Sequence, residues 1–311
     1  MSKTLVLAEK PSVGRELARV LKCSRKSDGC LIGDKYIVTW ALGHLVTLAD
    51  PEAYGDEYKT WSLETLPMLP GKMKLEVIKQ TSKQYSIVKR QLRSSEVSSV
   101  IIATDAGREG ELVARWIIEK SGVKKPIKRL WISSQTDKAI KEGFQKLRDG
   151  KEYYNLYMAA QARAEADWLV GLNVTRALTC KFNAQLSAGR VQTPTLALLV
   201  QRENEIKKFV PKEYYTIEAD IGKLFVSWRS KDGGLSTFDR EKAERISKEI
   251  KGKPFKLTSL RSSDKQTYAP MLYDLTELQR DANKLYGYSP KQTLNIMQKL
   301  YEQHKALTYP R

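Results

Sequence analysis

The chain has 311 residues, of which 54 are Lys or Arg and 36 are Asp or Glu, giving a formal net charge of +18. This length is enough for two or three domains with their own cores, and the excess positive charge indicates a polyanionic partner. No apolar run approaches the length of a membrane-spanning helix. Nucleic acid is therefore favoured over a membrane as the partner.

Several classes of site are excluded by what the sequence lacks. The cysteines Cys23, Cys30 and Cys180 form no CxxC pair, which predicts a reducing cytoplasm and no zinc ribbon. With His44 and His304 as the only histidines, a histidine-based metal site or catalytic triad is not expected. The phosphate-binding loops of ATP and dinucleotide sites are absent. The first residues lead directly into a strand and not into a signal peptide.

The first 135 residues alternate strands and helices, which predicts an α/β domain with a parallel sheet. We expect strands at 4–8, 36–42, 100–103 and 129–133, and helices at 11–20, 82–92 and 137–147, from their apolar periodicity. Residues 50–70 are rich in Pro, Gly and aromatic residues, and are expected to form a long excursion from the sheet.

Acidic residues follow two of these strands. Asp105 comes directly after the strand at 100–103, and Glu109 and Glu111 fall in the first turn of the next helix. Glu9 and Lys10 follow the first strand, so two acidic strand ends can converge on one Mg²⁺. The alternatives are that the helix residues complement the helix dipole and that Glu9 and Lys10 form a surface pair.

From residue 152 the composition changes to a long predicted helix ending near 182. It carries Arg163 and Asp167, spaced to form an ion pair, and Trp168, which is either a core residue or a base-stacking platform. The following loop, 187–195, has small residues, hydroxyls and Arg190 before a helix at 196–204. This arrangement suits a phosphate, although an ordinary capped loop is the alternative.

The remaining elements are a hairpin at 214–221 and 224–228, a helix at 241–250, a strand at 255–260 and amphipathic helices at 272–285 and 291–301. The chain then closes with Tyr309 between Thr308 and Pro310, and Arg311 beyond. A tyrosine can attack a phosphodiester and conserve its energy in a phosphotyrosine bond, and Arg311 could neutralise charge developing on phosphorus. On spacing alone, such a triplet is more often an ordinary loop.

Five segments in this order give the chain an end-to-end resemblance to the type IA DNA topoisomerases, in particular to the bacterial topoisomerase III group. The segments are LVLAEKPSVG at 5–14, ATDAGREGELVARW at 103–116, LSAGRVQTPTL at 186–196, YDLTELQRDAN at 273–283 and LTYPR at 307–311. The resemblance implies an α/β Toprim domain at 1–135, followed at 152–311 by a mixed helical and β region from the gate-forming body.

Carried over residue by residue, the resemblance gives roles to individual positions. Tyr309 matches the nucleophile and Arg311 the arginine beside it, while Lys10 matches a lysine that contacts the scissile phosphate. Glu9, Asp105 and Glu109 match acidic residues of the magnesium site. DNA contacts are implied for six loop residues: Ser187, Ala188, Gly189, Arg190, Val191 and Gln192. They are also implied for three side chains outside the loop: Trp61, Trp168 and Arg176.

The implied activity is to cut one DNA strand through a 5′-phosphotyrosine link, pass another strand and reseal, with Mg²⁺ and without ATP. The implied substrates are single-stranded segments of supercoiled or catenated DNA in the bacterial cytoplasm, at the nucleoid. Two departures matter. Gly107 replaces the middle carboxylate of the metal motif, which predicts a single Mg²⁺. The sequence ends at Arg311, so we expect a truncated chain in which Tyr309 frays and strand passage is incomplete.

Two other functions stay open at this point. A Toprim nuclease or primase would use the same acidic strand ends and leave Tyr309 idle. A non-catalytic single-stranded DNA clamp would follow from the net charge of +18 and would bind with a steep salt dependence but no response to Mg²⁺.

Overall fold

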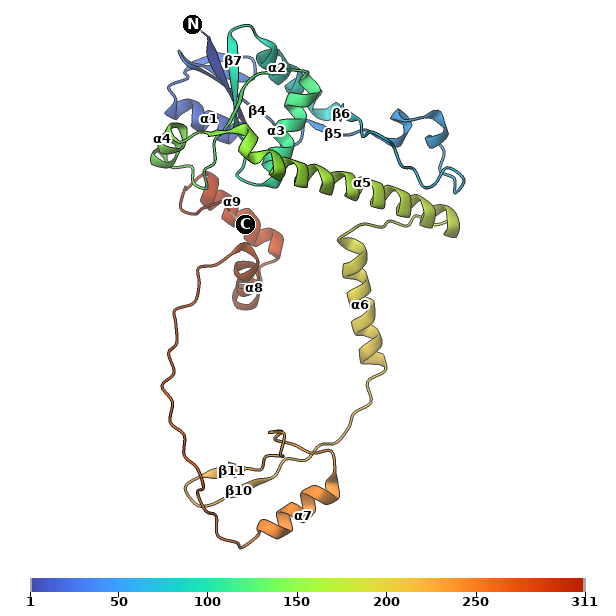
Figure 1. Cartoon of the computed structure of the whole chain (residues 1–311), viewed down its shortest axis with the longest axis vertical. Coiled ribbons are helices and arrows are strands. Elements are labelled where there is room, and N and C mark those ends of the chain that lie inside the picture. The colour runs from blue at the N-terminus through green and yellow to red at the C-terminus, as the bar shows by residue number, and fades with distance from the viewer. Residues whose placement is uncertain (1, 310–311) are drawn as a thin grey trace. The chain divides into compact units, whose positions relative to one another are not determined.

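A computed structural model describes residues 2–309, so Arg311 lies outside the described residues. The described chain forms two compact units (Figure 1). One unit joins the residues up to Thr193 with those from Leu272 onward, and the other is Pro194–Met271. Among the described residues, no helix is long and apolar enough to cross a membrane.

The first unit is built on a seven-stranded mixed sheet with the order β2-β3-β4-β1-β7-β8-β9. The strands are β1 (Lys3–Ala8), β2 (Arg25–Ser27), β3 (Cys30–Ile32), β4 (Tyr36–Trp40), β7 (Val97–Ala103), β8 (Ile127–Arg129) and β9 (Arg148–Asp149). The central strands β4, β1, β7 and β8 are parallel, and the outer ones pair antiparallel. Ala8 of β1 is in register with Ala103 of β7, so the carboxyl ends of these strands meet at one edge.

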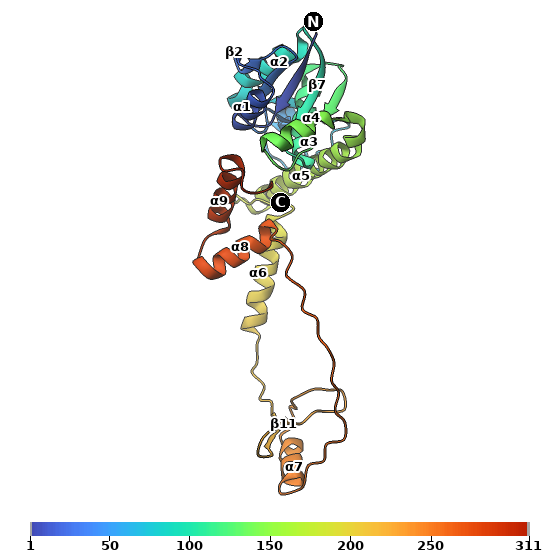
Figure 2. The ribbon, with the colours of Figure 1, turned by 90° about the vertical axis from the view of Figure 1, so that its left-hand side faces the viewer.

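Helices cover both faces of this sheet (Figure 2). On one face, α1 (Pro11–Val20) and α4 (Asp137–Gln145) enclose a core that includes Val6 and Ile101. On the other, α2 (Ser82–Arg93) and α3 (Arg108–Ser121) cover Leu5 and Ile102. Successive residues of a strand point to opposite faces, which is why continuous apolar runs give two cores.

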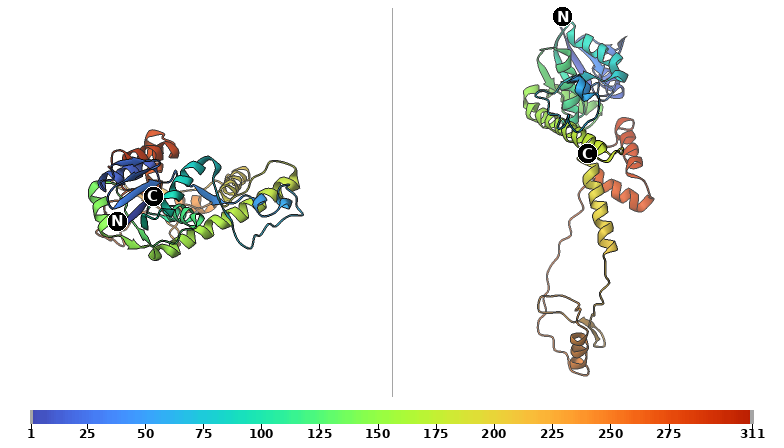
Figure 3. Two further views of the ribbon diagram at one scale, coloured as in Figure 1. Left: turned by 90° about the horizontal axis from the view of Figure 1, so that it is seen from above. Right: turned by 90° about the vertical axis from the view of Figure 1, so that its right-hand side faces the viewer.

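The expected excursion between residues 50 and 70 is present, and its base is a short antiparallel pair. β5 (Val46–Leu48) pairs with β6 (Leu75–Val77), and two short 3₁₀ helices (Pro51–Ala53 and Asp56–Tyr58) lie between them. The excursion lies beside α5 (Tyr154–Phe182), as Figure 3 shows. Asn173 of α5 fixes it with two hydrogen bonds to the Met68 backbone, at 2.6 and 3.0 Å.

Two further helices of the first unit precede Tyr309. α8 (Leu275–Tyr286) begins at Asp274, whose side chain accepts a hydrogen bond from the Glu277 N–H, and α9 (Pro290–Glu302) begins at Ser289 in the same way. Such side-chain caps satisfy backbone donors that have no partner within the helix. The helices predicted at 272–285 and 291–301 are both confirmed, and the observed ends differ from the predicted ones by at most a few residues.

The second unit carries most of α6 (Gln192–Lys207), the hairpin strands β10 (Glu218–Asp220) and β11 (Phe225–Ser227), and α7 (Arg240–Ile250). The strand expected at 255–260 was wrong, because these residues form no strand and Phe255, Leu257 and Leu260 are exposed. An alternating pattern forms a strand only where another strand offers a pairing edge. The strand expected at 129–133 also ends early, at Arg129.

Candidate active site

Glu9 and Asp105 meet at the sheet edge where β1 and β7 end. The Asp105 backbone N–H donates a hydrogen bond of 2.9 Å to Glu9 Oε2. Burial raises the pKa of both carboxyls, and the charge of Asp105 raises the pKa of Glu9 further. The parallel register thus places two partly desolvated carboxylates together, as the sequence predicted.

A buried arginine from β8 holds the turn that carries Asp105. Arg129 Nη1 donates hydrogen bonds to the backbone carbonyl oxygens of Ile102, Thr104 and Leu130, at 3.2, 2.8 and 2.7 Å. Its Nη2 donates to the backbone carbonyl oxygen of Asp105 at 2.7 Å. Its side chain is fully buried. No local pattern in the sequence marks Arg129, since an arginine at the end of a strand is ordinarily exposed.

The charge of Arg129 is balanced by Glu111 in the first turn of α3. Arg129 Nε lies 2.6 Å from Glu111 Oε1, and Arg115 Nε lies 2.9 Å from Glu111 Oε2. Glu111 is fully buried. Its carboxylate therefore serves a structural ion pair and is not exposed at the helix start to complement the helix dipole.

The turn between Asp105 and α3 leaves no space for a side chain at Gly110. A Cβ atom there would stand 2.1 Å from the Asp105 carbonyl oxygen. Thr104 closes the same turn, because its Oγ1 donates to the Gly110 carbonyl oxygen at 2.7 Å. This close packing of backbone on backbone fixes the direction in which the Asp105 side chain leaves the sheet.

Tyr309 lies against this edge of the sheet. Its backbone N–H donates to the Ser133 carbonyl oxygen at 2.9 Å, and its side chain lines the same cleft as Glu9 and Asp105. Its ring contacts Tyr301 edge to face, with centroids 5.6 Å apart. Burial and the neighbouring carboxylates raise its pKa well above the ordinary value. The expected fraying of Tyr309 is therefore wrong, because a backbone hydrogen bond and a ring contact hold it.

Tyr301, which sequence reasoning did not single out, is a buried residue near the end of α9. It lines a small cavity with Gln135 and Asp105, and burial raises its pKa to about 12. Because it is neutral and packed, it serves as a wall for the Tyr309 ring.

Lys10 extends from the end of β1 toward α9. Its Nζ lies 3.1 Å from Glu302 Oε1, and the two side chains are 35% and 24% exposed. Burial alone would lower the pKa of Lys10, but the bond to Glu302 and the charges of Glu302, Asp105 and Glu9 outweigh it, so the pKa is raised. Lys10 is therefore a fixed positive charge beside the carboxylate pair.

The donors present fit a magnesium ion held by two carboxylates. Within residues 2–309, no group of three or more Asp, Glu, His or Cys side chains is close enough to hold a metal ion. Glu109 turns to His44 and Arg163, with closest N–O distances of 3.8 and 3.9 Å. Mg²⁺ is commonly bound by one or two carboxylates together with substrate phosphates. Glu9 and Asp105 meet that requirement, and a role for Glu109 stays a prediction.

Introducing an aspartate at Gly107 should strengthen magnesium binding. A Cβ atom at Gly107 would meet nothing within 4 Å, and the residue has an extended backbone (φ −170°) that any amino acid adopts. Gly107→Asp should therefore fold normally and add a carboxylate, lowering the Mg²⁺ dissociation constant about tenfold because affinity follows ligand charge. Calorimetric titration with MgCl₂ measures this, and Gly107→Ala is the control. Equal affinity in both variants would contradict the prediction.

Glu9, Asp105, Glu109 and Tyr309 line one cleft of about 500 Å³, a size typical of small-ligand sites. The family profile described as DNA topoisomerase matches residues 151–311, just over half of the chain, and the profile of the Toprim domain matches residues 4–135. The chain belongs to the DNA topoisomerase family.

Individual topoisomerases agree with this. DNA topoisomerase 3 of Bacillus subtilis (strain 168) is 63% identical over 312 aligned residues, which cover 100% of this chain and 43% of that protein. The Bacillus cereus (strain ATCC 14579) protein of the same name is 62% identical with the same coverage. Full-length topoisomerase I of Thermotoga maritima superimposes with a TM-score of 0.65 at 25% identity, over 99% of this chain and 49% of that one. The chain thus spans less than half the length of these relatives.

The resemblance to type IA topoisomerases and the α/β Toprim fold are confirmed by these matches. The loop predicted to contact DNA in this topoisomerase chain is ordered by Thr175 and Thr193. Thr175 Oγ1 accepts from the Ala188 N–H and Thr193 Oγ1 from the Gly189 N–H, each at 3.0 Å. Ala188 is buried, whereas the other loop residues are exposed or partly exposed: Ser187, Gly189, Arg190, Val191 and Gln192.

Arg190 reaches back to α5. Its Nε lies 2.6 Å from Asp167 Oδ1, and Asp167 also lies 3.8 Å from Arg163. The Arg163–Asp167 pair predicted from spacing is therefore present. A DNA phosphate would have to compete with Asp167 for Arg190, and the DNA contacts of this loop stay a prediction.

The remaining predicted DNA contacts divide by burial. Trp61 is 47% exposed, and the Arg176 guanidinium lies 5.2 Å from its ring centre. Arg176 itself is only 2% exposed and donates to the Tyr58 carbonyl oxygen at 2.9 Å, so it supports the excursion and has no surface to offer to DNA. Trp168 packs on Tyr54 and against the core that contains Leu5 and Ile102, which agrees with its interpretation as a core residue.

Proposed function

We propose that this chain carries the strand-cutting chemistry of a type IA topoisomerase, with Tyr309 as nucleophile. The observation that supports it is that the Tyr309 side chain lines one cleft with Glu9 and Asp105, with Lys10 as a neighbouring positive charge. These residues come from both ends of the chain, and a tyrosine beside a carboxylate pair and a fixed cation is what attack on phosphorus requires. The further roles, passage of a second strand and resealing without ATP, rest on the family.

The chain's own groups account for the proton and the charge. Tyr309 must lose its proton on attack, and Glu9 and Asp105, whose pKa values are raised by burial when no metal is bound, are the carboxylates placed to accept it. The bond from tyrosine oxygen to phosphorus forms while the bond to the 3′ oxygen breaks, and the proton passes to that oxygen. Lys10 stabilises the phosphate charge. Resealing is the reverse transfer, so the DNA bond energy is retained.

A magnesium ion fits this site, with Glu9 and Asp105 as the residues that would hold it. When bound, Mg²⁺ neutralises phosphate charge and helps to orient the broken end. We further propose single-stranded segments of duplex DNA as substrate, in the bacterial cytoplasm. Arg311 remains the predicted second cation beside the nucleophile.

Trapping with denaturant tests the proposal. A single-stranded oligonucleotide labelled at its 3′ end is incubated with the chain and stopped with detergent. A 5′-phosphotyrosine link carries the label onto the protein band, and a 5′ label gives only a free fragment. Free 3′- and 5′-labelled fragments without protein linkage would support a nuclease instead, and intact DNA would support a binding clamp.

Substituting Asp105 with asparagine should raise the melting temperature of the chain and impair its function. Because the pKa of Asp105 is raised in the folded chain, chiefly by burial, ionising it costs folding stability. The cost is absent below the ordinary carboxyl pKa of about 4 and grows as the pH rises. Asp105→Asn should thus have a higher Tm than the parent at pH 7 in EDTA, and a difference that vanishes near pH 3.

The same variant should lose the magnesium dependence of resealing. Calorimetric melting from pH 3 to 7 measures the first effect, and adduct reversal on adding MgCl₂ measures the second. A Tm gain that is independent of pH would contradict the stated cause. An unchanged response to magnesium would remove Asp105 from the ligand pair.

A further inference from the structure

The segment that carries Tyr309 leaves α9 through a turn at Lys305. Lys305 has φ +53°, a left-handed conformation that is costly for a residue with a side chain. The turn is closed by the Ala306 N–H, which donates to the Leu300 carbonyl oxygen at 2.9 Å. The turn sends the chain back toward the sheet edge. Because the conformation of Lys305 is costly, we expect a further contact to stabilise it.

The Lys305 side chain supplies that restraint. Its Nζ lies 2.6 Å from Glu16 Oε1 on α1, and both side chains are only about a quarter exposed, at 26% and 24%. The two residues are 289 positions apart. The ion pair therefore ties the turn after α9 directly to a helix of the Toprim domain, four residues before the nucleophile.

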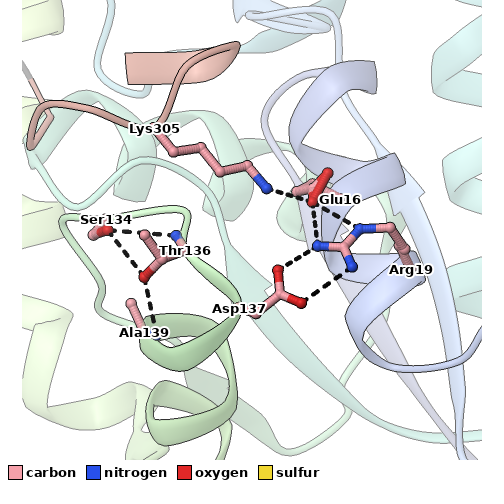
Figure 4. Close-up of polar contacts among 7 residues, drawn as sticks. All are labelled: Glu16, Arg19, Ser134, Thr136, Asp137, Ala139 and Lys305. Carbon is pink, nitrogen blue, oxygen red and sulfur yellow. Dashed lines mark hydrogen bonds and ion pairs between the residues drawn. The ribbon is translucent and has the colours of Figure 1, made fainter. Parts of the chain in front are cut away.

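Glu16 is in turn held in place by its own neighbours (Figure 4). Arg19 donates to Glu16 Oε1 through Nε and Nη2, at 2.9 and 2.6 Å. The same guanidinium binds Asp137 at the start of α4 in a bidentate pair. Thr136 caps that helix by accepting from the Ala139 N–H. Contacts within and between α1 and α4 thus orient Glu16 independently of Lys305.

We infer that Glu16 and Lys305 are positioning residues for Tyr309, and that their ion pair keeps the tyrosine segment closed on the carboxylate edge. The inference rests on the proposed function, in which Tyr309 attacks DNA at that edge. Neither residue lines the cleft that holds Tyr309, and Glu16 shares a smaller neighbouring cavity with Asp105 and Tyr301, so the ion pair acts on Tyr309 through the position of the segment. When the pair is broken, the left-handed turn loses its restraint and Tyr309 leaves Asp105 more often.

A double-mutant cycle tests this on the full chain. The rate of adduct formation is measured in single turnovers with saturating 3′-labelled oligonucleotide, for Glu16→Gln, Lys305→Asn and the double variant. Asparagine tolerates the left-handed conformation, so Lys305→Asn removes the charge and spares the backbone. Each single change should slow the rate about fivefold, and the double variant should be no slower than either, because the pair acts as a unit.

The controls separate this effect from general charge loss. Lys291→Gln on α9 and Glu142→Gln on α4 remove exposed charges from two of the helices next to the network, without touching its residues. Both should keep the parent rate, and Lys305→Arg should keep most of it. Affinity for the oligonucleotide should stay the same in all variants. Additive losses in the double variant, or single variants at the parent rate, would overturn the inference.

A second measurement is independent of catalysis. Hydrogen exchange of the Tyr309 amide, which is bonded to the Ser133 carbonyl oxygen, should accelerate about fivefold in Lys305→Asn and stay unchanged in Lys291→Gln. Unchanged exchange in Lys305→Asn would refute the inference whatever the activity. A parent chain that forms no adduct would instead refute the proposed function, and the exchange result would still decide the role of the ion pair.

Discussion

Replacing Tyr309 with phenylalanine is expected to abolish the covalent protein–DNA adduct and to leave DNA affinity within about twofold of the parent, since only one oxygen atom is removed and the rest of the DNA-binding surface is unchanged. The substitution removes only the Tyr309 hydroxyl, on the side chain that lines the cleft with Asp105. The ring still contacts Tyr301, and the backbone N–H still donates to Ser133. A denaturing gel with 3′-labelled oligonucleotide reports the adduct, and fluorescence anisotropy with the same oligonucleotide reports affinity.

Tyr286→Phe is the matched control for this experiment. Tyr286 lies in α8 of the same unit and is 69% exposed, so loss of its hydroxyl should change neither adduct nor affinity. If Tyr309→Phe still formed a protein-linked product, another nucleophile would have to be sought and the proposed function would be wrong. If both variants lost the adduct, the assay would be reporting general damage to the unit.

The second large effect is expected at Arg129. Arg129→Met should destabilise the chain by about 3–5 kcal/mol, because it leaves the charge of Glu111 buried with fewer partners. It also deprives four backbone carbonyl oxygens of a donor, those of Ile102, Thr104, Leu130 and Asp105. Urea unfolding followed by circular dichroism measures the loss. Function should fall with it, since the turn held by Arg129 carries Asp105.

Two companion variants show whether charge is the cause. Arg15→Met removes an exposed arginine from α1 and should stay within about 0.5 kcal/mol of the parent. Adding Glu111→Gln to Arg129→Met should recover part of the loss, since it removes the uncompensated buried charge. A loss below about 1 kcal/mol for Arg129→Met would be no more than an ordinary substitution costs and would show that the buried ion pair between Arg129 and Glu111 is dispensable.

Elements with strong local signals were predictable from the sequence. The apolar runs of β1 and β7 gave the strands, the residues after them gave Glu9 and Asp105, and parallel pairing brought those two together. The motifs in order gave the family before any geometry. Prediction was wrong where the local signal was weak. The alternating residues at 255–260 form no strand, and the strand predicted at 129–133 ends at Arg129.

The sequence by itself determined the fold class, the family and the carboxylates at the strand ends, because those follow from patterns within short segments. Tertiary structure alone decided which charges are used internally. Arg129 and Glu111 are buried as partners, Arg176 is enclosed by the excursion, and Lys305 finds Glu16 from 289 positions away. Whether a charged side chain meets water, DNA or another side chain depends on which segments pack around it, and no spacing within one segment contains that information.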